Sequence, residues 1–237
     1  MSLVLLLRTA LLNIICISVV SCGIDSIVYL NDNPVLTSTD DSTSIFKGPE
    51  SNNSSYLGVE IFYRIYSSLS DADADKSTIS TKQDVDESIP GSVINEYLIN
   101  PNGLKYKNLI LVNIQDNTLQ RRIPTILSTE IPDSSYFVSI EFPSASNEEP
   151  FITITNEVAN EKTLHLLLKR NSGIANDYLR FIDEPKVGDP DFKANTNSTT
   201  PGTYYVQLYA ASYGLNFVDF SELYGDAVFI GRIILNF

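Results

Sequence analysis

Residues 57–66 read LGVEIFYRIY, and the alternation of their side chains decides the fold class. Leu57, Val59, Ile61, Tyr63 and Ile65 fall on one face of an extended chain, and Gly58, Glu60, Phe62, Arg64 and Tyr66 fall on the other. A period of two over ten residues predicts a β-strand with one buried face.

The same pattern returns near the C-terminus, where residues 204–211 read YYVQLYAA. Other short runs rich in Val, Ile, Tyr, Phe and Thr are separated by Pro, Gly, Asn, Asp and Ser, which favours strands joined by turns. These runs cover residues 25–30, 43–46, 105–114, 136–142, 151–155, 162–169, 177–182 and 226–236. The chain is therefore predicted to be all-β.

One short helix is predicted after Ser92, because Val93, Ile94, Tyr97 and Leu98 share a helical stripe. Residues 67–89 consist largely of Ser, Asp, Ala, Lys and Thr without periodicity, so we expect a mobile loop there.

Composition excludes several classes of protein. The 237 residues allow one or two domains, and 43% hydrophobic residues exclude wholesale disorder. A net charge of -13 argues against nucleic-acid binding, which depends on neutralising phosphates with Lys and Arg. Two Cys and one His are too few for zinc fingers, Fe–S clusters or a disulfide framework, and no cofactor is expected.

The N-terminus reads as a targeting segment. Of the first 20 residues 15 are apolar, and Arg8 is the only charged one. The apolar stretch is too short to span a bilayer, which is typical of a signal peptide, here residues 1–21. It ends in Val19-Val20-Ser21-Cys22-Gly23, which resembles the lipobox of bacterial lipoproteins.

The lipobox resemblance implies cleavage before Cys22, a diacylglyceryl thioether on its sulfur, and a further acyl chain such as palmitate. Several acyl chains on one residue anchor a protein stably, whereas one chain is marginal. The remaining residues 22–237 would carry 15 basic and 29 acidic side chains. The alternative is an ordinary signal peptide or an uncleaved anchor with an incidental Cys22.

A second resemblance concerns the β body. Tyr204-x-Val206-x-Leu208-x-Ala210, followed by Gly214, resembles the penultimate strand of a fibronectin type III domain, and residues 56–64 resemble its third strand. A lipobox ahead of this layout is similar to families of spirochaetal lipoproteins. The chain departs from the domain's pattern by having no Trp and by placing 136 residues, 67–202, between the two matching parts.

The resemblance implies an immunoglobulin- or fibronectin III-like sandwich with a large β-rich insertion. Residues 22–66 would form the lipidated N-terminus and the first part of the sandwich, and residues 203–237 its closing strands. Residues 67–202 would form the β-rich insertion or a second subdomain that includes the mobile loop 67–89.

Few residues suggest chemistry. Asp71-x-Asp73-x-Asp75 has the alternate carboxylates that calcium favours, but Lys76 and Lys82 stand where an EF-hand loop needs Gly and Glu. A solvated acidic loop is the favoured interpretation, with these aspartates as the only metal candidates. His165 is predicted on the outer face of a strand, and no catalytic residue is predicted.

Four tyrosines are the best indication of binding. Tyr66, Tyr205, Tyr209 and Tyr213 fall on the predicted outer face or at its end, and amphipathic rings are favoured at interfaces. The alternative is that they pair across strands or are covered by the insertion.

These patterns predict a non-catalytic binding or structural module, held by its lipid in the bacterial cell envelope, at the outer membrane or cell surface. Its expected partners are the membrane and another envelope or host macromolecule, and not nucleic acid. Two alternatives stay open: a hydrolase of envelope polymers that uses distant acidic residues, and an outer-membrane β-barrel, which charged residues on the outer faces disfavour.

Overall fold

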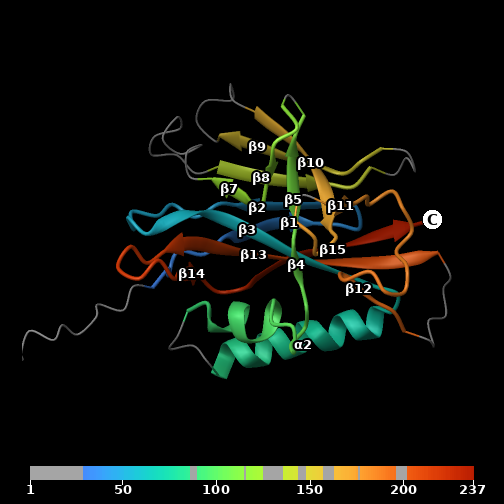
Figure 1. Ribbon diagram of the computed structural model, residues 1–237, viewed down its shortest axis with the longest axis horizontal. Coiled ribbons are helices and arrows are strands. Elements are labelled where there is room, and N and C mark those ends of the chain that lie inside the picture. Colours follow the sequence, from blue (N-terminus) through green and yellow to red (C-terminus); the bar gives the residue numbers. More distant parts are fainter. Residues whose placement is uncertain are drawn as a thin grey trace, which may run out of the picture.

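The computed structural model describes residues 29–85, 90–114, 116–124, 136–143, 148–156, 163–175, 177–195 and 202–237. The predicted signal peptide, Cys22 and most of the predicted strand 25–30 lie outside these ranges. Within them the chain is an all-β sandwich of two sheets, with a helical layer under the second sheet (Figure 1).

The first sheet is antiparallel and has β1 and β6 as the ends of its main path. Its order is β1 (Val35–Thr39), β2 (Thr43–Lys47), β8 (Tyr136–Glu141), β9 (Phe151–Asn156), β10 (Thr163–Asn171), β5 (Ile110–Asn113) and β6 (Leu119–Gln120), with β11 (Tyr178–Leu179) paired to β10.

The second sheet is centred on β13 (Thr203–Leu215), which pairs antiparallel with β3 (Tyr56–Tyr66) and with β15 (Val228–Asn236). Four short strands complete it: β14 (Glu222–Tyr224) on β13, and β4 (Lys107–Asn108), β7 (Arg122–Pro124) and β12 (Phe192–Lys193) on β3. Residues 67–202 thus supply most of the first sheet, three strands of the second, and the helices.

The main core lies between the sheets and uses the apolar faces that the alternation predicts. Val59, Ile61, Ile65, Val206 and Leu208 are at most 2% exposed and pack against the first sheet. Leu57 is an exception and packs on the helical side, because the β3–β13 ladder skips it where the register shifts.

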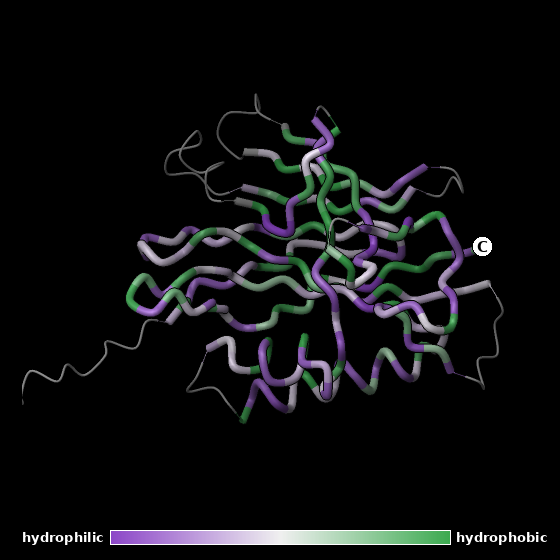
Figure 2. Tube along the Cα trace, in the orientation of Figure 1, coloured by the Kyte–Doolittle hydropathy of each residue, from purple (hydrophilic) through white to green (hydrophobic). Residues whose placement is uncertain are grey.

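The prediction of a mobile loop over residues 67–89 is wrong for the helix α2 (Leu69–Val85). Ala72, Asp75 and Ile79 are its buried residues, at a helical spacing that places them on the sheet side. Only two of the three are apolar, so the stripe is too sparse to predict a helix from the sequence. Figure 2 shows α2 coloured mostly hydrophilic beneath strands with long hydrophobic stretches.

The helix predicted after Ser92 is a short π-helical turn, η1 (Ile94–Leu98). Val93, Ile94 and Leu98 are buried, as the stripe predicts, against the same face of the second sheet as α2. In the described part of the chain, no helix combines the length and apolar composition that crossing a membrane requires.

Candidate functional site

The four predicted binding tyrosines do not form an exposed patch, so the predicted exposure is wrong. Tyr66, Tyr209 and Tyr213 are at most 2% exposed, and Tyr205 is half-buried. Their rings belong to a second apolar cluster that also holds residues of α2, η1 and β14. The sequence signal was correct for the strand faces, but the residues between β3 and β13 cover the outer one.

Hydroxyl groups and charges tie the helix to this face. The Tyr66 hydroxyl donates to Asp75 Oδ2 at 2.8 Å and lies 2.9 Å from the Tyr106 hydroxyl. Gln207 Nε2 donates to Tyr106 at 2.8 Å, and Lys193 Nζ donates to Asp75 Oδ1 at 2.9 Å. Burial raises the pKa of Tyr66 far above its ordinary value, so its hydroxyl stays protonated as a donor.

The three aspartates predicted as metal candidates lie on α2 and bind different partners. Asp71 Oδ2 accepts from Asn195 Nδ2 at 2.7 Å, and Asp73 Oδ1 accepts from Arg232 Nη2 at 2.6 Å. Asp75 is buried in the hydroxyl network. Among the residues that the structure describes, no group of three or more His, Cys, Asp or Glu is placed to hold a metal ion.

Glu60 is a buried carboxylate on the helical side of β3, and its oxygens already have partners. Oε1 accepts from Arg122 Nε at 2.6 Å, and Oε2 accepts from Asn108 Nδ2 at 2.5 Å and from the Tyr224 hydroxyl at 3.2 Å. Burial raises the pKa of Glu60, and the hydrogen bond and charge of Arg122 act against that shift.

A second buried group of charges joins β10 to the segment before β12. The Arg170 guanidinium donates to Asp191 at 3.0 and 2.9 Å and to Asp189 at 2.5 Å. The Tyr63 hydroxyl donates to the same Asp191 at 2.6 Å. Arg170 and Asp191 are at most 1% exposed, so this ion pair joins two segments inside the protein and is not accessible to a substrate.

His165 lies on the exposed face of β10, as the alternation predicts. Its Nδ1 is 3.0 Å from the Thr153 hydroxyl, and its ring meets the edge of Phe151. These contacts pair the side chain across β9 and β10.

The strongest candidate site is a cavity of about 580 Å³ at one end of the sandwich. Four separate segments line it: the β1–β2 turn, the β8–β9 connection, the residues after β11, and the end of β15. Its lining residues are Asp41, Ser42, Phe142, Pro143, Glu148, Pro150, Phe181, Ile182, Ile234, Leu235, Asn236 and Phe237. We call it the end pocket.

The walls of the end pocket are aromatic and its rim is acidic. The rings of Phe142 and Phe181 meet edge to face with centroids 5.1 Å apart, and Phe237 packs on Tyr204. Asp41 and Glu148 are exposed, and none of the lining residues is basic. The pocket therefore suits a ligand with an apolar face and a neutral or positively charged polar group.

No sequence signal points to this pocket, because its lining comes from segments up to about 200 residues apart that only the tertiary fold brings together. A scan against protein-family models finds no match for the chain, and searches of the curated proteins and of the solved structures find none either.

Proposed function

We propose that this chain is a lipid-anchored protein of the bacterial cell envelope whose β body binds a ligand in the end pocket without catalysing a reaction. The anchor is supported by the lipobox-like residues around Cys22 and the apolar segment before them. The single observation that carries the binding role is the aromatic, acid-rimmed end pocket, whose volume lies in the range of small-ligand sites.

Binding is favoured over hydrolysis because the buried carboxylates already have hydrogen-bond partners within the protein. Glu60 has its oxygens bonded to Arg122, Asn108 and Tyr224, and Asp191 is bonded to Arg170 and Tyr63. A general acid or base needs an oxygen that reaches the substrate, whereas these oxygens hold strands together.

The ligand class is tested with three matched aromatic probes: benzylamine, benzyl alcohol and benzoate. Calorimetry should rank their affinities in that order, since the carboxylates of Asp41 and Glu148 attract a cation and repel an anion. The double variant Asp41→Asn, Glu148→Gln should remove the ranking, and Asp116→Asn, on the exposed β5–β6 turn, should keep it. Equal binding of benzoate and benzylamine by the wild type would contradict the proposal.

The anchor is tested by fractionation of bacteria that express the full chain. Cys22→Ala should move the protein from the detergent-requiring fraction to the soluble one, because the acylated sulfur is lost. Cys16→Ala, inside the apolar segment, is the matched control and should leave the protein at the membrane. Continued detergent dependence of the Cys22→Ala protein would refute the lipid anchor.

A further inference from the structure

The loop between β13 and β14 exposes an unusual amount of apolar surface. Phe217, Val218 and Phe220 are 55%, 78% and 73% exposed. In the described ranges no other stretch of four residues exposes more than one large apolar side chain. Exposed apolar clusters of this kind mark surfaces that meet a partner. We call residues 216–221 the apolar tip.

Hydrogen bonds within the apolar tip order its backbone. Asn216 N donates to Ser221 O at 2.9 Å, and Phe220 N donates to Asn216 O at 2.7 Å. Val218 N donates to Asn216 Oδ1 at 3.0 Å, and Ser221 N donates to Asp219 Oδ1 at 2.9 Å. Phe220 has φ 59, a left-handed conformation that is unfavourable for a bulky residue.

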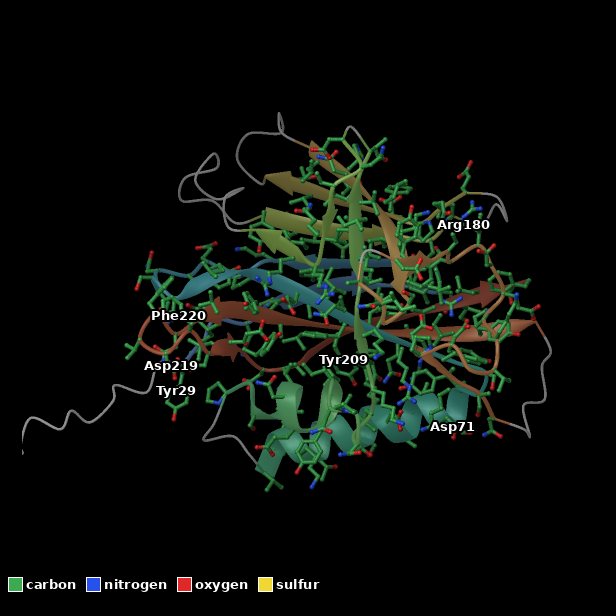
Figure 3. The ribbon with its side chains drawn as sticks, in the orientation of Figure 1. Tyr29, Asp71, Arg180, Tyr209, Asp219 and Phe220 are labelled. Carbon is green, nitrogen blue, oxygen red and sulfur yellow. The ribbon has the colours of Figure 1, made fainter. Side chains whose placement is uncertain are left out.

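The first described residues, Tyr29 and Leu30, pack beside the apolar tip. Tyr29 O accepts from Asn53 Nδ2 at 3.0 Å, and the buried Leu30 packs against Gly214, two residues before the tip. A Cβ at Gly214 would lie closest to the carbonyl oxygen of Ser55 and 3.1 Å from Leu30 Cδ1, so the missing side chain permits both close approaches. In Figure 3, Tyr29, Asp219 and Phe220 lie at one end of the molecule and Arg180 at the other.

Six residues, 23–28, lie between Cys22 and Tyr29, so the Cα atoms of these two residues are at most about 25 Å apart. On the proposed function, a lipid-bearing Cys22 therefore holds this end of the body close to a bilayer. We infer that the apolar tip inserts Phe217, Val218 and Phe220 into the interface of the membrane that carries the lipid anchor. This inference rests on the proposed anchor but names a separate contact.

The orientation that follows places the end pocket away from the membrane. β13 runs from Thr203, beside the C-terminal Phe237 of the pocket, to Leu215, which leads into the tip. The strand is about 40 Å long at an ordinary rise per residue, so the two sites lie at opposite ends of the body. A ligand thus reaches the pocket from the aqueous side.

The lipid expected at the tip is zwitterionic. Hydrogen bonds from the Ser221 hydroxyl and amide lower the pKa of Asp219, so its exposed carboxylate is charged between the apolar side chains. A charged carboxylate at the surface disfavours anionic headgroups, so vesicles of phosphatidylcholine are the appropriate probe.

The absence of tryptophan makes the contact measurable, since one substitution introduces a unique fluorophore. Phe220→Trp reports on the tip. Val187→Trp is the control, because Val187 is 86% exposed in the segment leading to β12, which pairs with the far end of β3. Each protein is bound to vesicles with brominated acyl chains, as the native full-length lipoprotein and as residues 22–237 held by an N-terminal hexahistidine tag on a nickel-chelating lipid.

We expect bromine to quench Phe220→Trp several-fold more than Val187→Trp in both preparations. Equal, weak quenching of both in the tagged protein would overturn the tip contact, whatever the fate of the anchor. Quenching in the tagged protein without membrane association of the native one would refute the lipid anchor and support the tip. A concentration-dependent blue shift of Phe220→Trp without vesicles would assign the tip to self-association and also overturn the inference.

A second variant separates membrane contact from folding. Phe220→Asn should raise the melting temperature by a few degrees, because Asn tolerates the left-handed conformation, and should weaken vesicle binding of the tagged protein after imidazole is added. A variant that binds vesicles as well as the wild type would contradict the inserted tip.

Discussion

The two faces of the second sheet are buried by different physics. Toward the first sheet, Val206 and Leu208 of β13 enter a core of aliphatic and aromatic side chains, where the stabilisation of these two residues is proportional to their buried area and has little direction. Toward α2, the same strand presents Gln207, which donates to the Tyr106 hydroxyl, and β3 presents the buried Glu60. There burial depends on specific hydrogen bonds and charges, so a change at one atom should matter more than a change in volume.

We call the face of the second sheet that packs against α2 the helical face. The largest effect should come from deleting the helix that covers it. Deletion of residues 70–82 takes away most of α2 and exposes Tyr66, Tyr209 and Phe62, which are at most 2% exposed in the intact body. At about 1.5–3 kcal/mol for each large side chain, the loss is roughly 5 kcal/mol or more, comparable with the whole stability of a domain.

Circular dichroism melting should therefore show no cooperative transition for this deletion. The double variant Thr78→Ala, Thr81→Ala is the control, because both hydroxyls lie on the exposed side of α2 and bond only to its own carbonyls. It should melt as the wild type does. A deletion protein that melts within a few degrees of the wild type would show that the face is stable uncovered.

The inner face should respond to volume. Leu208→Ala removes a fully buried side chain from the core between the sheets and should lower the free energy of unfolding by about 2–5 kcal/mol. Leu208→Met, which nearly conserves volume, should lower it by less than about 1.5 kcal/mol. Urea titration of the two variants checks this, and equal losses would mean that shape rather than volume governs the core.

The sequence predicted one of these faces well and the other only in part. Alternation along residues 57–66 and 204–211 identified the sandwich and most of its core, because a period of two is a local property of the chain. It could not show what covers Tyr66 or Tyr209, since the covering helix contributes only Ala72 and Ile79 as apolar contacts. A polar helix becomes recognisable only when its partners are known.

The candidate sites were harder to predict for the same reason. The sequence places Asp75 in a calcium-like spacing of aspartates, whereas its partners Tyr66 and Lys193 come from the ends of two strands. The end pocket combines residues as distant as Asp41 and Phe237. Sites assembled from residues so far apart in the sequence depend on tertiary contacts, and no local sequence pattern predicts them.

An intermediate effect is expected when one hydroxyl is removed from the helical face. Tyr66→Phe keeps the ring but leaves the buried carboxylate of Asp75 and the hydroxyl of Tyr106 without their shared partner. The free energy of unfolding should fall by about 1–3 kcal/mol. Tyr205→Phe, at the half-buried margin of the face, is the matched control and should change it by less than about 0.5 kcal/mol. Similar losses for both variants would contradict a directional network.

The smallest effect is the pH dependence that Glu60 contributes on the helical face. Because burial raises the pKa of Glu60 above 4.5, the folded chain holds this proton more tightly than the unfolded chain does. Ionisation of Glu60 therefore costs stability as the pH rises from about 4.5 through the folded pKa, and the cost is constant above that value. Glu60→Gln has no such cost, although it loses the ion pair with Arg122.

The measurement is the free energy of unfolding in urea at several values from about pH 4 to about pH 7. The free energy of unfolding of the wild type, minus that of Glu60→Gln, should decrease as the pH rises. The reason is that only the wild type has a buried carboxyl group to ionise at this position. Glu222→Gln, which changes the more exposed carboxylate on the same Arg122, should give a difference that does not follow this trend. If the free-energy difference between the wild type and Glu60→Gln increases with pH instead, the attraction of Arg122 for the Glu60 carboxylate outweighs the cost of burying it. The charges of the helical face would then stabilise the fold.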